Sequence, residues 1–203
     1  MQLRLPWACP IVSGKAPGHC HRAVVLGAGP VGLLGAMAFV AADFDTYVYS
    51  RKPAPCAKSR VAETIGATYI SAETHSLEQL AREIGNIDLV YEAAGASSIS
   101  FELIKPLGTN GIFIFTGVSG RKAPIEVDTD LVMRNLVLKN QVLFGTVNAG
   151  LDAYEAAVRD LSLFMGRWPE AVRSLMTGRY AVTAYRDVLL ENPGGIKNVM
   201  TFD

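Results

Sequence analysis

The sequence is poor in cysteine and has no excess of charge of either sign. Its three cysteines, Cys9, Cys20 and Cys56, are an odd number and widely spaced, so they cannot form a fully paired disulfide framework. A reducing cytoplasm is therefore the simpler expectation. The 19 Lys and Arg residues balance 19 Asp and Glu residues, and no long basic run occurs. This balance argues against a nucleic-acid-binding protein that works by neutralising phosphates.

Long hydrophobic runs are also scarce, and the longest is interrupted. Segment 23–42 carries no charge, but four glycines and Pro30 within it favour a strand, a tight turn and a helix over a membrane span. Pro6 and Pro10 break the first apolar run of the chain, which makes a poor signal peptide. We therefore expect a soluble intracellular protein with no membrane partner, in which residues 1–22 form an irregular arm.

What the sequence does contain is enough apolar material for a core. Half of its residues are hydrophobic, which excludes disorder of the whole chain. Past residue 22, short β-branched or aromatic runs alternate with amphipathic stretches, which predicts an α/β fold with a doubly wound parallel sheet and helices on both faces. The strands are expected at Ala23–Leu26, Thr46–Tyr49, Thr68–Ile70, Ile87–Tyr91, Ile112–Phe115 and Val142–Phe144. The helices are expected at Val31–Ala42, Ala57–Ile65, Leu77–Ile84, Ser98–Lys105 and Leu131–Lys139.

Local signals mark the ends of two of these helices. Ser76 and Gln79 have the spacing of a capping box at the start of the third helix. Pro106 and Gly108 are expected to end the fourth helix. Proline has no amide hydrogen to continue the helical hydrogen bonds, and glycine readily adopts the left-handed backbone conformation that ends many helices.

The main chemical signal is a glycine-rich turn, LGAGPVG, at residues 26–32. A GxGxxG spacing is weak on its own, but this one follows an apolar strand and opens an apolar helix. Gly27 permits the tight turn, Gly29 lets the backbone approach a pyrophosphate, and Gly32 allows the helix to pack closely on the strand. We interpret the turn as the dinucleotide site of a Rossmann-type domain; the alternative is a turn that serves only packing.

The alternation of strands and helices stops after Gly150, which divides the chain. We assign residues 23–150 to the Rossmann-type NAD(P)-binding domain. Residues 151–203 are expected to add helices at Asp152–Met165 and Pro169–Met176 and a terminal strand in Ile196–Phe202, all packed on that domain.

The end of the second strand indicates which dinucleotide is bound. Sites for NAD usually place Asp or Glu there, about 20 residues past the turn, to hold the ribose 2′-hydroxyl. Here the strand ends in Ser50, Arg51 and Lys52, and a hydroxyl with two cations suits a ribose 2′-phosphate, which Arg51 can bind bidentately. The sequence favours NADP, with NAD as the alternative cofactor and a solvated basic loop as the structural alternative.

Two further strand ends give weaker signals. Ala93, in the run Tyr91–Gly95, is a small residue at a strand end that would pack against the adenosine part of a cofactor. Thr116, Gly117 and Val118 end the fifth strand and could face the nicotinamide. Each run could equally be an ordinary strand-to-helix turn.

Several runs, taken in order, resemble the C-terminal half of the glucose dehydrogenase branch of the zinc-type medium-chain alcohol dehydrogenases. These runs are VVLGAGPVGLLGAMAF, YVYSRK, DLVYEAAG, GIFIFTGVSG, NLVLKNQVLFGTVNAG and GIKNVMTF. The resemblance covers about residues 23–203. It implies a Rossmann domain that pairs in relatives with a GroES-like catalytic domain, absent from this chain. The implied activity is NAD(P)-dependent oxidation of an aldose at C1 to its lactone.

Carried over by position, the resemblance implies a set of cofactor contacts. Lys197 matches a basic residue that reaches the cofactor phosphates in relatives, although a surface lysine near a chain end is an equal alternative. Contacts to the pyrophosphate and to the adenosine ribose phosphate would come from Gly29, Pro30, Val31, Ser50, Arg51 and Lys52. Contacts near the nicotinamide would come from Thr116, Gly117, Val118, Phe144, Val147 and Asn148.

Catalytic zinc is part of the family pattern, and here the sequence departs from it. Relatives bind zinc through a Cys-Gly-Thr-Asp-like element and a Gly-His-Glu-like element, and neither occurs in these 203 residues. His19, Cys20 and His21 are adjacent, so they cannot readily converge on one tetrahedral ion. We therefore assign no metal site and no catalytic residue.

Two functions remain in competition. The first is the NADP(H)-binding domain of a glucose or aldose dehydrogenase, inactive alone because the zinc-binding domain is missing. The second is a non-catalytic nucleotide-binding or redox-sensing protein derived from such an enzyme. A short-chain dehydrogenase is excluded, because no tyrosine has a lysine four residues on. The expected partner is a second copy in a symmetric homodimer, or a separate catalytic domain.

Overall fold

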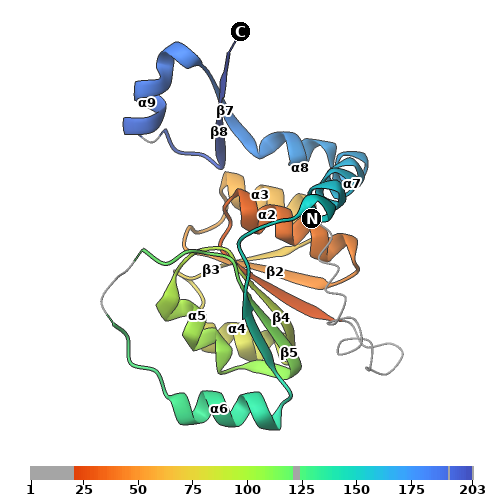
Figure 1. The fold of residues 1–203 in the computed structure, drawn as a ribbon, viewed down its shortest axis with the longest axis vertical. Helices are drawn as coiled ribbons and strands as arrows, with labels where there is room; N and C mark the ends of the chain where they lie inside the picture. Colours follow the sequence, from red (N-terminus) through yellow and green to blue (C-terminus); the bar gives the residue numbers. More distant parts are fainter. Residues whose placement is uncertain (1–20, 121–123, 192, 203) are drawn as a thin grey trace.

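The computed structural model describes residues 21–120, 124–191 and 193–202, and it shows an α/β fold built on one large sheet (Figure 1). Six parallel strands lie in the order β3-β2-β1-β4-β5-β6, which is the order of a Rossmann domain and confirms the expected fold class. The strands are β1 (Arg22–Leu26), β2 (Asp45–Ser50), β3 (Thr68–Ser71), β4 (Ile87–Glu92), β5 (Leu107–Phe115) and β6 (Val142–Gly145).

Helices cover both faces of this sheet. α2 (Pro30–Ala41) and α3 (Ala57–Thr64) lie on one face, and α4 (Leu77–Ile84) and α5 (Ser97–Ile104) lie on the other (Figure 1). Because successive side chains of a strand point to opposite faces, β1 supplies both cores: Val25 packs with the α2 and α3 side, and Val24 with the α4 and α5 side. Such two-sided burial explains why the strands read as almost wholly apolar runs.

The capping box at the third expected helix is confirmed, but the role expected for Gly108 at the end of the fourth is wrong. Ser76 accepts a hydrogen bond from the Gln79 amide, and the Gln79 side chain accepts one from the Ser76 amide. α5 ends at Ile104, before Pro106, as expected. Gly108, however, does not form a left-handed exit: it is buried inside β5, which begins at Leu107 instead of Ile112. A side chain there would overlap Asn86, so this glycine serves close packing.

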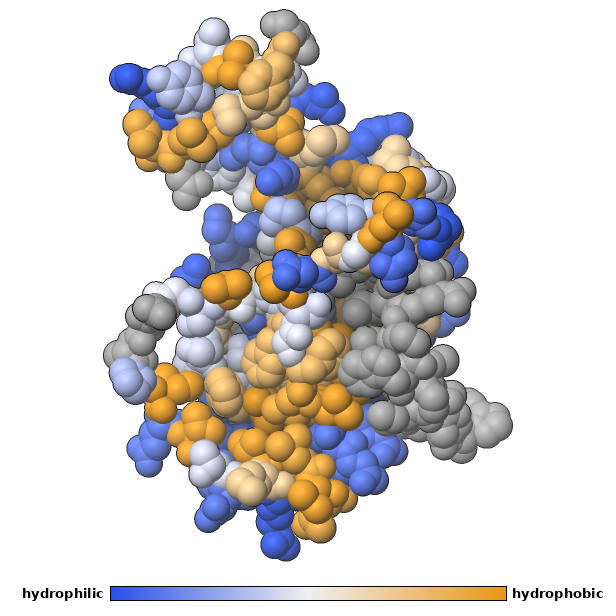
Figure 2. All heavy atoms as spheres, in the orientation of Figure 1, coloured by the Kyte–Doolittle hydropathy of each residue, from blue (hydrophilic) through white to orange (hydrophobic). Residues whose placement is uncertain are grey.

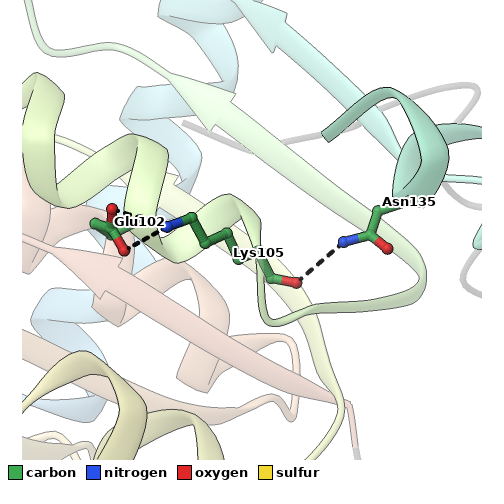
Figure 3. Close-up of polar contacts among 3 residues, drawn as sticks. All are labelled: Glu102, Lys105 and Asn135. Atoms are coloured by element: carbon green, nitrogen blue, oxygen red, sulfur yellow. Dashed lines mark hydrogen bonds and ion pairs between the residues drawn. The ribbon is translucent and has the colours of Figure 1, made fainter. Parts of the chain in front are cut away.

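α6 (Thr129–Leu138) lies at the border of the domain, and none of its residues is fully buried. Its contact with the rest of the domain includes a hydrogen bond of 3.4 Å from Asn135 Nδ2 to the carbonyl oxygen of Lys105, just past the end of α5 (Figure 3). The Lys105 ammonium in turn pairs with the Glu102 carboxylate at 2.9 Å. α6 is therefore joined to the domain by these polar contacts and by Val132, which packs against the core on the α4 and α5 side, while Met133, Val137 and Leu138 stay exposed.

The C-terminal part contains the two expected helices, α7 (Leu151–Arg167) and α8 (Pro169–Ser174). Phe164 of α7 and Val172 of α8 join the core on the α2 and α3 side of the sheet. α8 ends before Met176, which had been expected in this helix but begins a strand, because its backbone pairs with Lys197. The resulting small parallel sheet comprises β7 (Met176–Ala181) and β8 (Lys197–Thr201), with η1 (Val182–Ala184) and α9 (Tyr185–Leu190) between them.

The described part of the chain begins just before β1. Residues 1–20 of the expected N-terminal arm lie outside the described residues, while Arg22 already belongs to β1 and donates its amide to Asp88 Oδ2 at 2.9 Å. No helix in the described part of the chain has the length and hydrophobicity needed to cross a bilayer.

Candidate functional site

The candidate site lies at the carboxyl edge of the six-stranded sheet. Leu26, the last residue of β1, is paired with Tyr49 on one side and with Glu92 on the other. Glu92 is paired with Phe115, and Phe115 with Gly145. These strands therefore end side by side, and the strand order reverses between β1 and β4, which is where doubly wound sheets bind their ligands.

The turn after β1 leaves room beside the start of α2. Gly27 has φ +100°, and a side chain at Gly32 would overlap the carbonyl oxygen of Gly27. Gly29 differs, because a Cβ atom built there meets no atom within 4 Å. Gly29 is also the N-cap of α2 and provides no side-chain cap, and Pro30 occupies the first turn. The first turn of α2 therefore begins beside open space at Gly29, and an uncapped helix start of this kind suits an anion.

The residues after β2 place two cations at the same edge. Arg51 and Lys52 are exposed, and neither side chain has a hydrogen bond or an ion pair with a described residue. Their backbone, by contrast, is held by β3: Tyr69 Oη donates to the Lys52 carbonyl at 2.8 Å, and Ser71 Oγ to the Arg51 carbonyl at 3.2 Å. Burial raises the pKa of Tyr69, which keeps its hydroxyl protonated as a donor.

The loops after β4 and β5 are joined by the buried carboxylate of Glu92. Its Oε1 accepts hydrogen bonds from the amides of Ala94 at 2.8 Å and Gly95 at 2.7 Å, and its Oε2 accepts one from Gly117 at 3.1 Å. Thr116 Oγ1 donates to the Glu92 carbonyl at 2.7 Å. A side chain at Gly117 would overlap the Gly95 backbone, so the two loops touch each other.

The loop after β4 also touches the glycine turn. A Cβ atom built on Gly27 would lie 3.1 Å from the Cβ atom of Ala94 and 3.3 Å from the carbonyl of Ala93. The loops that follow β1, β4 and β5 therefore form one continuous backbone surface. The sequence-predicted residues Gly27, Ala93 and Gly117 all belong to it.

The remaining predicted residues divide between the sheet edge and a second sheet. Phe144 lies in β6 opposite Ile114 and is half-buried, and the exposed Val147 and Asn148 follow that strand. Lys197 instead begins β8 in the small sheet, and its exposed side chain makes no hydrogen bond or ion pair with a described residue. The structure thus brings the predicted residues of the six-stranded sheet to one edge and leaves Lys197 on a different element.

Sequence reasoning missed the three side chains that hold this edge together. The structural role of Glu92 had a signal, because a carboxylate at the end of an apolar strand is almost never buried without partners. Tyr69 and Ser71 had none, because their partners become neighbours only when β3 pairs with β2.

The described part of the chain offers no metal centre. No group of three His, Cys, Asp or Glu residues within it could hold a metal ion. His19 and Cys20 lie outside the described residues. The zinc ion implied by the resemblance therefore finds no set of ligands among the residues described.

Comparisons with known proteins show the family of this chain. The family model "Glucose dehydrogenase C-terminus" matches residues 11–202. The glucose 1-dehydrogenase of Metallosphaera sedula is 32% identical over 202 residues, covering 98% of this chain and 52% of that protein. That of Methanocella arvoryzae is 31% identical over 177 residues, covering 87% and 49%. This chain spans about half the length of the curated relatives it matches.

A solved structure of a similar protein contains NADP. The glucose dehydrogenase of Haloferax mediterranei in complex with NADP, Zn and gluconolactone superimposes with a TM-score of 0.84 at 25% sequence identity. The match covers 100% of this chain and 56% of that chain. The α/β fold of the matched part of that protein is therefore also the fold of this chain.

Proposed function

Because this chain belongs to the glucose dehydrogenase C-terminal family, we propose that it is the NADP(H)-binding domain of a dehydrogenase that oxidises glucose or a related aldose. One observation carries the proposal: the uncapped start of α2 lies at the same sheet edge as two cations that lack partners among the described residues. A pyrophosphate and a ribose 2′-phosphate are the two anionic groups of NADP, and this edge offers one site for each.

The proposed contacts follow the order of the strands. Gly29 and Val31 would receive the pyrophosphate on backbone amides, with Gly27, Pro30 and Gly32 shaping the turn. Ser50, Arg51 and Lys52 would bind the 2′-phosphate, with Ala93 as the wall on the adenosine side. Bound NADP supplies the hydride acceptor for oxidation of an aldose at C1. The residues proposed around its nicotinamide are Thr116, Gly117, Val118, Phe144, Val147 and Asn148, with Lys197 proposed at the phosphates.

A titration tests this proposal. The purified chain is titrated with NADPH and with NADH, and binding is followed by the fluorescence of the reduced nicotinamide. NADPH is expected to bind more tightly. In the double variant Arg51→Ala/Lys52→Ala, NADPH affinity should fall about 10- to 100-fold, the value of lost hydrogen bonds to a charged group, while NADH affinity changes little.

The matched control removes two cations elsewhere. Arg134→Ala/Arg159→Ala takes the same charge from exposed positions on α6 and α7 and should leave both affinities unchanged. Equal losses of NADPH and NADH in the first variant would contradict the assignment of the basic pair to the 2′-phosphate. No binding of either dinucleotide by the wild-type chain would contradict the proposed function itself.

We further propose that the isolated chain binds cofactor without turnover. The support is the sequence, which contains neither zinc-binding element of the family, and the half-length match to complete enzymes. An assay with glucose and NADP, with and without added zinc, should therefore show no NADPH formation. Steady NADPH formation by the purified chain would overturn this part of the proposal, whereas binding without turnover is also what a redox-sensing descendant would show.

A second copy of the chain is the proposed partner. β6 is an edge strand of the sheet, and the neighbouring α6 exposes Met133, Val137 and Leu138. Figure 2 shows apolar atoms gathered at the bottom of the molecule, where α6 lies in Figure 1. An open strand edge next to exposed apolar side chains favours symmetric pairing. Light scattering should give twice the 21.8 kDa chain mass, and Val137→Asp should shift it to the monomer value. A monomer in the wild type at high concentration would contradict the homodimer.

A further inference from the structure

Two side chains of β3 hold the backbone of the basic segment that follows β2. Tyr69 Oη donates to the Lys52 carbonyl oxygen at 2.8 Å, and Ser71 Oγ donates to the Arg51 carbonyl oxygen at 3.2 Å. A third bond, from the Ala72 amide to the Ser50 carbonyl at 2.8 Å, continues the β2–β3 pairing to the start of this segment. Three consecutive carbonyl groups, those of residues 50–52, are therefore fixed from one neighbouring strand.

The two anchoring side chains are themselves well held. Because alternate residues of a strand share a face, Tyr69 and Ser71 point to the same side of the sheet. Tyr69 packs against the core under α2 and α3. Ser71 is buried, and its hydroxyl oxygen also accepts the Glu73 amide at 3.2 Å. The anchors therefore belong to the rigid domain, although the segment that they hold is exposed.

The segment has little else to order it. Residues 51–55 are all exposed, and the Arg51 and Lys52 side chains have no hydrogen bond or ion pair with the described residues. Without the bonds from β3, the backbone of the pair would have to be ordered when a phosphate binds, and that ordering costs affinity. With them, the two cations start from a fixed backbone at the sheet edge.

We propose that Tyr69 and Ser71 are positioning residues that set the preference of this site for a ribose 2′-phosphate over a ribose 2′-hydroxyl. The inference rests on the proposed function, since it assigns the basic pair to the 2′-phosphate. Neither side chain needs to touch the cofactor. Each acts through the backbone of the residue whose cation binds the phosphate.

The experiment compares four probes on Tyr69→Phe and Ser71→Ala. Adenosine 2′,5′-bisphosphate and 5′-AMP differ only by the 2′-phosphate, and NADPH and NADH differ in the same way. Each variant removes one hydroxyl, so the affinity for NADPH and for the bisphosphate should fall roughly 2- to 10-fold, the value of one hydrogen bond, while NADH and 5′-AMP change less than about 2-fold. Ser71→Thr keeps the hydroxyl and should retain the wild-type ratio.

Controls separate positioning from stability. Tyr47→Phe removes a tyrosine hydroxyl from the adjacent strand, where it bonds Asp45, and Ser162→Ala removes a serine hydroxyl that bonds a carbonyl on α7. Both should leave all four affinities unchanged. A general structural role for Tyr69 and Ser71 would lower the affinities of phosphorylated and unphosphorylated probes equally, and that result would overturn the inference.

The outcome also separates this inference from the proposed function. If the wild-type preference for NADPH depends on Arg51 and Lys52 but survives both Tyr69→Phe and Ser71→Ala, the positioning role alone is wrong. If the wild-type chain shows no preference for NADPH over NADH, the 2′-phosphate assignment fails and the positioning role fails with it. Circular dichroism of each variant establishes that the comparison is made on folded protein.

Discussion

The carboxylate of Glu92, buried at the end of β4, accepts a hydrogen bond from the backbone amide of Gly117 beyond the end of β5, at 3.1 Å. The same carboxylate also accepts the amides of Ala94 and Gly95. One side chain therefore accepts hydrogen bonds from three backbone donors in two loops: the Ala94 and Gly95 amides, and the Gly117 amide, which it shares with the Glu92 carbonyl oxygen. A buried carboxylate is stable only when hydrogen-bond donors surround it, and buried backbone amides in a loop are stable only when they have an acceptor. The Glu92 carboxylate and the amides of these two loops therefore stabilise each other.

We predict that Glu92→Gln is strongly destabilising although it preserves size and shape. A carboxylate accepts at both oxygens, whereas an amide must direct its NH₂ group at one of the three donors. Leaving a buried donor unsatisfied costs about 1–3 kcal/mol, and the free energy of unfolding measured in urea should fall by that amount.

The matched substitution is Glu102→Gln on α5, where an exposed carboxylate pairs with Lys105. Because an exposed ion pair contributes little, its loss should cost less than about 1 kcal/mol. Equal losses of unfolding free energy in the two variants would mean that the three hydrogen bonds from backbone amides to the Glu92 carboxylate stabilise the protein no more than an exposed ion pair does.

The glycines of the turn after β1 should respond differently to alanine. At Gly32 the added methyl group overlaps the Gly27 carbonyl oxygen, so Gly32→Ala should lower the free energy of unfolding by about 1–3 kcal/mol. At Gly29 it enters open space with an extended backbone, so the cost should be about 1 kcal/mol or less, the loss of a favourable N-cap residue.

For cofactor affinity we expect Gly29→Ala, which costs little stability, to have a clear effect. The open space at Gly29 is where the pyrophosphate is proposed to lie, so Gly29→Ala should weaken NADPH and NADH equally in a fluorescence titration. Gly166→Ala, on α7 with open space around it, serves as the control and should leave binding unchanged. Unaltered cofactor affinity in Gly29→Ala would place the pyrophosphate elsewhere.

The glycine turn and the large sheet were predictable because their signals are local. The apolar run at 23–26 and the glycines after it prescribe a strand and a turn whatever the rest of the chain does. β7 carries no comparable signal: its sequence MTGRYA is mostly exposed and shows no apolar alternation, and it becomes a strand only by pairing with β8. Met176 was therefore assigned to the preceding helix.

The same distinction applies within the candidate site. Gly27, Gly29 and Gly32 act through their own backbone, and Arg51 and Lys52 through their own charge, so a sequence reveals them. Tyr69 and Ser71 act on residues 17 and 20 positions away. Their role depends on the register of β3 against β2, and register is set by burial of the whole sheet face rather than by any short motif.

The remaining prediction concerns Cys56, the N-cap of α3. Burial raises the pKa of its thiol, but hydrogen bonds with the Ser59 amide, the Tyr69 hydroxyl, the Lys58 amide and the Ser59 hydroxyl outweigh this effect, and the pKa lies below its usual value. The folded pKa is therefore below the unfolded one. The thiolate contributes stability above the unfolded pKa, and this contribution is lost as the pH falls through the folded pKa.

Alkylation by iodoacetamide, followed against pH in the Cys9→Ser/Cys20→Ser variant, tests this directly, because the thiolate is the reacting form. The midpoint of the rate should lie below that of the same chain in urea. Identical midpoints for the folded and unfolded chains would mean that the hydrogen bonds at the start of α3 do not stabilise the thiolate.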